Sequence, residues 1–178
     1  MNILIAYSSR TGTVKICASL LGRELNTHSV TYADLETESP DPSKFDAVIL
    51  GTSIRMAKAG KGFRSYISNY KNKLEGILHG FFLCCAESAE DELLFYQRKN
   101  IPSSLLESSF ANDYFGGELS LDRAKGFDKI LIRMIRSSYS TLADESENYT
   151  KKTLPTIAEP VIAQYADKLK AELTKRTN

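Results

Sequence analysis

Apolar runs alternate with segments of helical periodicity from the first residues of the chain. Residues 3–7 form a continuous apolar run, and apolar side chains then recur at helical spacing over residues 14–25. The same alternation continues towards the C-terminus. It predicts strands at residues 3–7, 28–35, 46–51, 77–86 and 111–119. It predicts helices at residues 14–25, around 63–70, and at 89–99, 103–109 and 156–175.

Strands that alternate with helices favour right-handed crossovers and a parallel sheet covered on both faces. The sequence therefore predicts an α/β fold with a three-layer, doubly wound, five-stranded parallel sheet of strand order 2-1-3-4-5. In that order the loops after Tyr7, Gly51 and Ala86 meet at the carboxyl ends of the strands. A ligand is expected at this edge of the sheet.

Length and composition are those of an ordinary globular protein. The chain has 178 residues, of which 42% are hydrophobic and 25% are charged, so we expect one domain over residues 1–178. Its apolar stretches are much shorter than the roughly 20 residues that cross a bilayer, and its start lacks a basic segment, so we expect a cytoplasmic protein. A net charge of +1 provides no overall field for nucleic acid.

The loop after the first strand is rich in hydroxyl groups and is followed directly by a helix. A helix N-terminus offers unpaired N–H groups and the positive end of a dipole, which together bind phosphate. Thr11 or Thr13 could instead simply cap the helix, but one hydroxyl is enough for a cap. The loop lacks the glycine pattern of dinucleotide sites and the lysine of a P-loop, which leaves a phosphate monoester. The predicted phosphate-binding residues are Ser8, Ser9, Arg10, Thr11, Gly12 and Thr13.

This loop resembles the FMN phosphate loop of flavodoxins, usually written Ser/Thr-x-Thr-Gly-x-Thr. Ser9, Thr11 and Gly12 match the pattern, whereas Val14 stands where a last threonine is expected and Thr13 lies one position earlier. The resemblance implies a flavodoxin-like fold with FMN as cofactor. It covers most of the chain.

Further segments resemble the menaquinone-dependent protoporphyrinogen dehydrogenase branch of flavodoxin-like enzymes. They are residues 49–55, Gly117-Glu118-Leu119, Phe127-Asp128-Lys129 and the apolar run 130–135, and that branch also carries a long insertion near the last strand. The resemblance implies two-electron chemistry with a small-molecule substrate and a quinone as acceptor.

Two more loops are expected to contact the flavin. The predicted contacts are Thr52, Ser53, Ile54 and Arg55 after the third strand, and Ala86, Glu87 and Ser88 after the fourth. Arg55 could donate to a reduced flavin or to an acidic substrate, or it could be a solvated loop arginine. Flavodoxins often stack an aromatic ring on the flavin at the position where this chain has Met56.

The three cysteines show no CxxC motif and no cysteine–histidine spacing, so neither a disulfide framework nor a metal site is expected. Cys85 lies in a predicted flavin loop. A redox role for this thiol is possible in principle, but packing is the favoured interpretation.

An insertion of about 120–153 precedes the closing helix. Its residues Phe127, Ile130, Leu131, Met134 and Ile135 recur at helical spacing, with Lys125, Lys129, Arg133 and Arg136 beside them. A helix over about 125–136 could rest on an anionic membrane surface. The stripe could equally pack against its own domain or against a second subunit.

Two other functions compete with the enzyme. A flavodoxin that only carries electrons is usually strongly acidic, whereas this chain has 23 basic and 22 acidic residues. A binding module without redox activity would have no use for a hydroxyl-rich loop at a helix start. The sequence therefore favours an FMN-dependent oxidoreductase over a carrier or a module.

Overall fold

A computed structural model describes residues 1–87, 89–141 and 154–177 of the protein. The strands are β1 (Asn2–Ser8), β2 (Ser29–Asp34), β3 (Ala47–Arg55), β4 (Lys58–Ala59), β5 (Leu78–Cys84) and β6 (Asn112–Tyr114). The helices are α1 (Thr13–Glu24), α2 (Lys61–Glu75), α3 (Glu90–Asn100), α4 (Ser103–Ser108), α5 (Gly126–Thr141) and α6 (Glu159–Thr177), with a short 3-10 helix at Pro42–Lys44.

Five of the strands form a parallel sheet in the order β2-β1-β3-β5-β6, which confirms the predicted 2-1-3-4-5 order. The pairing is continuous in register, from Ile3 beside Ala47 to Ser8 beside Thr52. It extends from β3 to β5, where Ser53 pairs with Cys84. The central strands are apolar on both sides because both of their faces are buried.

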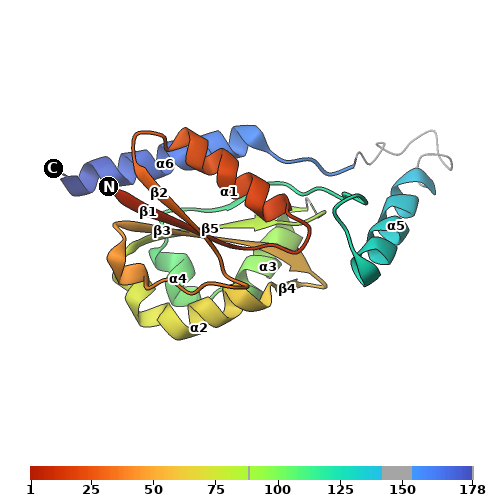
Figure 1. Ribbon diagram of the computed structural model, residues 1–178, viewed down its shortest axis with the longest axis horizontal. Helices are drawn as coiled ribbons and strands as arrows, with labels where there is room; N and C mark the ends of the chain where they lie inside the picture. Colours follow the sequence, from red (N-terminus) through yellow and green to blue (C-terminus); the bar gives the residue numbers. More distant parts are fainter. Residues whose placement is uncertain (88, 142–153, 178) are drawn as a thin grey trace.

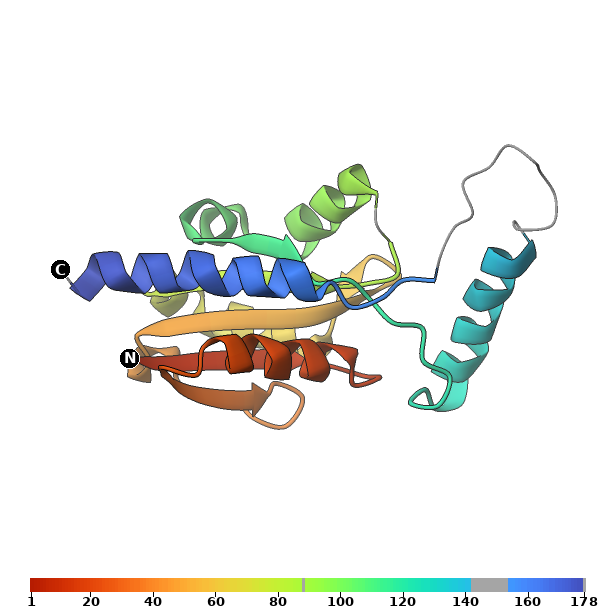
Figure 2. The ribbon, with the colours of Figure 1, turned by 90° about the horizontal axis from the view of Figure 1, so that it is seen from above.

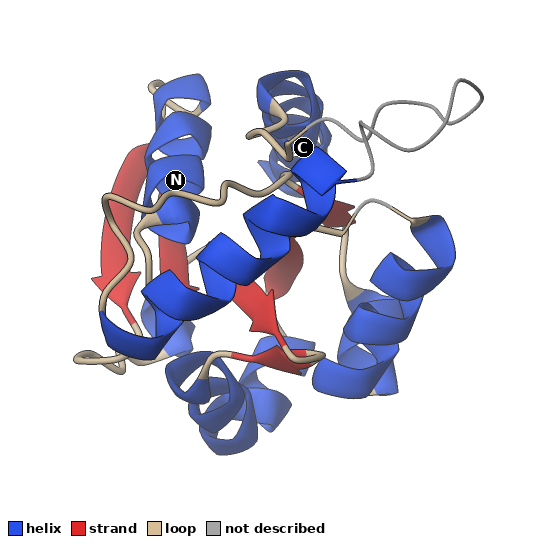
Figure 3. Cartoon of the chain, turned by 90° about the vertical axis from the view of Figure 1, so that its right-hand side faces the viewer, coloured by secondary structure: helices blue, strands red, loops and turns tan. Residues whose placement is uncertain are grey.

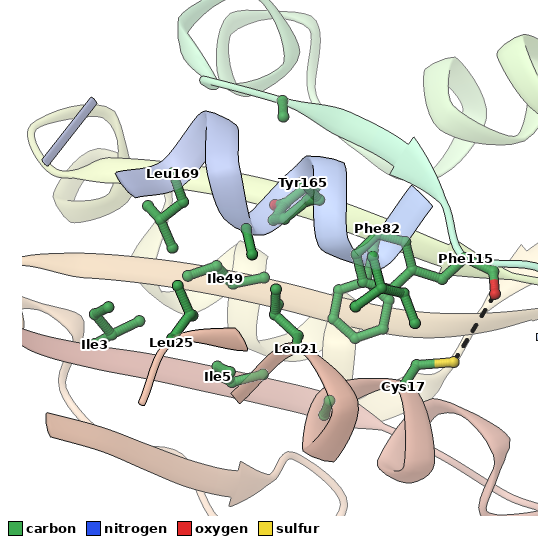
Figure 4. Close-up of a cluster of buried hydrophobic side chains, with 14 of the residues drawn as sticks. Ile3, Ile5, Cys17, Leu21, Leu25, Ile49, Phe82, Phe115, Tyr165 and Leu169 are labelled. Carbon is green, nitrogen blue, oxygen red and sulfur yellow. Dashed lines mark hydrogen bonds between the residues drawn. The ribbon is translucent and has the colours of Figure 1, made fainter. Parts of the chain in front are cut away.

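Helices cover both faces of this sheet (Figures 1 and 2). On one face α1 and α6 pack together over β1 and β3, where Leu21 and Tyr165 belong to a single buried cluster (Figure 4). The stacked rings of Phe82 and Phe115, with centroids 4.5 Å apart, continue this cluster. On the other face α2 and α4 enclose a second cluster that contains Phe63 and Leu105.

Two local predictions are wrong, and one short strand was not predicted. β6 is much shorter than the predicted strand 111–119, because Gly116 adopts a φ of 80° and turns the chain out of the sheet. The closing helix begins at Glu159 and not at residue 156, because Ile157 forms an antiparallel bridge with Gly116. The sequence pattern also did not predict β4, a short antiparallel partner of β3.

The insertion contains the predicted helix, as α5. This helix lies beyond the carboxyl edge of the sheet, at the opposite end of the molecule from both termini (Figures 1 and 3). Its predicted apolar stripe is divided between two environments: Leu131 and Ile135 line a cavity, whereas Phe127, Ile130 and Met134 are 66%, 55% and 64% exposed. Residues 142–153 of the insertion lie outside the described residues.

Candidate functional site

A cavity of about 270 Å³ lies where the loops after β1, β3 and β5 meet. The segment after β6 and one side of α5 complete its wall. Of the predicted site residues, the cavity is lined by Arg10, Thr11, Thr13, Ser53, Ile54, Arg55 and Ala86. Ser8, Ser9, Gly12, Thr52 and Glu87 do not line it, and Ser88 lies outside the described residues.

The start of α1 faces this cavity without a side-chain cap from the described residues. Gly12 is the N-cap residue and has a φ of 85°, so neither Thr11 nor Thr13 caps the helix. Ser9 Oγ accepts a hydrogen bond from the Gly12 N–H at 3.1 Å, which stabilises the turn. Thr13 Oγ1 is buried and has no hydrogen-bond partner in the described part of the chain. A buried hydroxyl without a partner at an uncapped helix N-terminus is suited to an anionic ligand.

Two other hydroxyls of the predicted set form hydrogen bonds within the protein. Ser8 Oγ donates to the carboxylate of Glu36. Thr52 Oγ1 accepts from the Gly60 N–H at 3.0 Å. A Cβ added at Gly60 would lie 1.8 Å from Ser8 Oγ, so only glycine fits at this start of α2. These contacts hold the ends of β1, β2 and β3 against α2.

One carboxylate of the insertion bridges two arginines of the site. Asp128 Oδ2 lies 3.1 Å from Arg10 Nη2, and its Oδ1 lies 2.5 Å from Arg55 Nη1. The Arg55 guanidinium also lies 5.4 Å from the ring centroid of Phe127. Arg55 Nε is buried and has no partner among the described residues. These contacts dock α5 against the loops after β1 and β3.

A second residue of the insertion, Arg123, contacts the loop after β1. Its Nε donates to the Thr11 carbonyl at 3.0 Å, and its Nη2 is paired with the Glu118 carboxylate. Its side chain covers Gly12, where an added Cβ would lie 3.6 Å from Arg123 Cδ. The Thr11 carbonyl is thereby held by a residue 112 positions later in the chain. No local sequence signal indicates this contact.

A two-residue turn joins β3 and β4 into a tight antiparallel hairpin. Arg55 pairs with Lys58 across it, and the two turn residues, Met56 and Ala57, have φ values of 49° and 59°. Both lie in the left-handed region that glycine and asparagine favour in such hairpins, so the turn is strained. The Asn100 side chain supports it by accepting from the Ala59 N–H at 2.8 Å and donating to the Ala57 carbonyl at 3.1 Å. Met56 is 81% exposed at the tip.

The loop after β5 contributes Cys84, Cys85 and Ala86 to the cavity. Tyr114 donates a 2.5 Å hydrogen bond to the Cys85 carbonyl, and a Cβ at Gly117 would lie 1.9 Å from the same oxygen. Burial raises the pKa of the Cys85 thiol to about 11. A hydrogen bond with Cys17 and burial also raise the pKa of the Cys84 thiol. Both thiols are therefore protonated near neutral pH and lack the thiolate that a nucleophile requires.

The described residues include no cluster of histidine, cysteine and carboxylate side chains that could hold a metal ion. Among the helices in the described ranges, none is both long enough and apolar enough to cross a membrane. The site is thus a mainly apolar cavity, with the N–H groups and hydroxyls of a helix start at one end and arginines at its rim.

Known proteins resemble this chain in sequence and in fold. A family model described as a flavodoxin domain matches residues 4–156. Protoporphyrinogen IX dehydrogenase (quinone) of Escherichia coli K12 is 24% identical over 143 residues, which cover 76% of this chain and 78% of that protein.

Among solved structures, two-electron reduced flavodoxin of Megasphaera elsdenii superposes with a TM-score of 0.53 at 14% identity, covering 63% of this chain and 84% of that one. A flavodoxin from the domain Archaea gives a TM-score of 0.48 at 12% identity and covers 94% of this chain and 99% of that one. The superposition on the Megasphaera elsdenii protein supports a flavodoxin-like fold for this chain.

The raised pKa of Cys85 predicts slow alkylation. At pH 8 the thiolate fraction falls about tenfold for each unit by which the pKa is raised. Iodoacetamide should therefore react with Cys85 about a hundredfold more slowly than with an unperturbed cysteine. The rate should rise with pH up to about pH 11, the pKa of this thiol. Mass spectrometry of timed reactions measures it, with the urea-unfolded chain as the control. Fast labelling of Cys85 at pH 8 in the folded protein would contradict the prediction.

Proposed function

Because this chain belongs to the flavodoxin domain family, we propose that it binds FMN in the cavity at the carboxyl edge of the sheet and acts as an oxidoreductase. The observation that carries the proposal is the buried Thr13 hydroxyl, which has no partner in the described part of the chain and lies at the uncapped start of α1. A phosphate monoester would supply the missing acceptor.

The residues around the cavity fit each part of the cofactor. The N–H groups at the start of α1 and the hydroxyls of Thr11 and Thr13 would hold the phosphate. The segments 53–56 and 84–86 offer backbone groups and apolar walls for the flavin ring. Bound FMN exchanges one or two electrons, while Arg55 places a positive charge beside the cavity. That charge favours an anionic reduced cofactor or an acidic substrate.

We further propose that the protein oxidises a small-molecule substrate and passes two electrons to a quinone, as the name of the Escherichia coli relative suggests. The near balance of 23 basic and 22 acidic residues supports an enzyme over an acidic carrier of single electrons. The cavity supports it as well, because α5 covers one side of the ring site with Leu131, Ile132 and Ile135. Enclosing a reaction site expels water, which favours chemistry on a bound substrate.

We also propose that α5 rests on the inner face of a membrane. Its exposed Phe127, Ile130 and Met134 offer an apolar edge, and the exposed Lys129 and Arg133 lie beside it. Such a helix binds anionic lipid surfaces through both kinds of contact. A quinone dissolved in the bilayer would then reach the cavity that the same helix lines.

Purified protein should be yellow, and acid should release FMN from it. Thr11→Ala should weaken FMN binding by about 1–3 kcal/mol, because a hydrogen bond to a charged phosphate is lost. Titration of the apoprotein, followed by flavin fluorescence, measures the affinity. Thr27→Ala, an exposed threonine beyond the far end of α1, is the matched control and should bind as the parent does.

Thr13→Val sharpens this test because it keeps the shape of the side chain. It should leave the apoprotein as stable as the parent or more stable, since a buried hydroxyl without a partner is removed. It should nevertheless weaken FMN binding. Parental affinity in both Thr11→Ala and Thr13→Val would sink the phosphate assignment.

Electron transfer distinguishes the enzyme from the carrier. Protein reduced with dithionite should be reoxidised by a soluble quinone analogue faster than by a one-electron haem protein. Stopped-flow absorbance of the flavin measures both rates at equal acceptor concentration. Equal or faster transfer to the haem protein would favour the carrier.

Vesicle binding tests the role of α5. The protein should sediment with anionic vesicles at low salt and be released by high salt. Lys129→Gln/Arg133→Gln should lose about 2 kcal/mol of binding, because each basic residue near the surface contributes on the order of 1 kcal/mol. Lys44→Gln, in the 3-10 helix at Pro42–Lys44, is the control. A parent that stays in the supernatant would exclude the membrane contact.

A further inference from the structure

A second hollow, of about 570 Å³, adjoins the proposed flavin cavity. The two share the wall formed by Arg10, Ser53, Arg55 and Met56. The rest of the hollow is lined by the second strand of the hairpin, the start of α2 and Glu36 after β2. A molecule bound there would therefore lie next to the cofactor.

Positive charge dominates this hollow. Arg10, Arg55, Lys58, Lys61 and Arg64 line it, and Glu36 is the only acidic residue among its lining residues. Because the whole chain carries only one excess positive charge, the cluster is a local feature and does not reflect composition.

The acidic groups nearby already have partners. The Glu36 carboxylate accepts from the Ser8 hydroxyl and, at 3.2 Å, from the Gly62 N–H. Asp128 is shared between two arginines of the wall. Three cations of the hollow form no ion pair with any described residue: Lys58, Lys61 and Arg64. They remain available to a ligand.

The start of α2 adds to this charge. Lys61 is the first residue of the helix and Arg64 lies in its first turn, where no acidic residue occurs. Cations at this end are unfavourable because they lie beside the positive end of the helix dipole, which favours anions. The arrangement therefore lowers the stability of the free protein and raises its affinity for a negative group.

We propose that this hollow binds the anionic groups, carboxylates or phosphates, of a small molecule that exchanges electrons with the flavin. Lys58 and Lys61 supply charge, and Arg64, whose Nε donates to the Ala59 carbonyl at 3.2 Å, presents the rest of its guanidinium from a fixed position. The electron-transfer role rests on the proposed function, whereas anion binding at the hollow does not.

Calorimetric titration with two probes, inorganic pyrophosphate and succinate, tests the proposal on FMN-loaded protein in buffer of matched ionic strength. At least one probe should bind to the parent. Lys58→Gln/Lys61→Gln, which keeps the hydrogen bond of Arg64, should weaken binding at least about tenfold. Lys71→Gln, an exposed lysine later in α2, should change it less than about twofold. Preference for one probe identifies the ligand as a phosphate ester or a carboxylate.

A stability measurement separates this site from a merely structural cluster. Lys61→Gln should raise the melting temperature of the free protein while it weakens binding of the probe. If the protein took up no FMN, the proposed function would fail but the inference about the hollow would not. Thr11→Ala then distinguishes the hollow from the anion site at the start of α1, because Thr11 does not line the hollow and probe binding there should survive the substitution. The inference is overturned if neither probe binds to the parent, or if Lys58→Gln/Lys61→Gln binds as tightly as the parent.

Discussion

Strand β1 is paired along its length with a parallel strand on each side, and β3 extends the same pairing to β5. The unbroken register brings the carboxyl ends of these strands to one edge, where Ser8 lies beside Thr52 and Ser53 beside Cys84. The loops after β1, β3 and β5, which line the cavity, start from this edge. A shift in the register of β1 would displace the loop that follows it relative to the loops after β3 and β5.

The parts of the molecule that follow from local pattern are predictable from sequence. Apolar runs predict the strands of the parallel sheet, and the hydroxyl-rich segment before Val14 predicts a loop at a helix start, which the structure places at the N-terminus of α1. Long-range pairing is not predictable in this way. In the sequence Asp128 is an isolated acidic residue in a basic segment, whereas in the structure its carboxylate bridges Arg10 and Arg55. The position of α5 brings Asp128 to these two arginines, and the local spacing of residues in the sequence does not predict that position.

Two neighbouring environments of different character share the β3–β4 hairpin as a wall. The cavity on α1 is mainly apolar with donors at one end, while the hollow at α2 is basic. Arg55 belongs to both, and its charge is partly balanced by Asp128. The strained turn belongs to this shared wall, because Met56 lines both environments, and Asn100 of α3 donates a hydrogen bond to the Ala57 carbonyl of the turn.

The contact between Arg123 and the Thr11 carbonyl has a consequence for the order of events during synthesis. In a chain that is still emerging from the ribosome, β1, β2 and β3 are present before residue 123 has been added. The loop after β1 of such a nascent chain lacks the Arg123 side chain that covers Gly12. The contact that holds the Thr11 carbonyl can therefore form only after the insertion has been translated as far as Arg123.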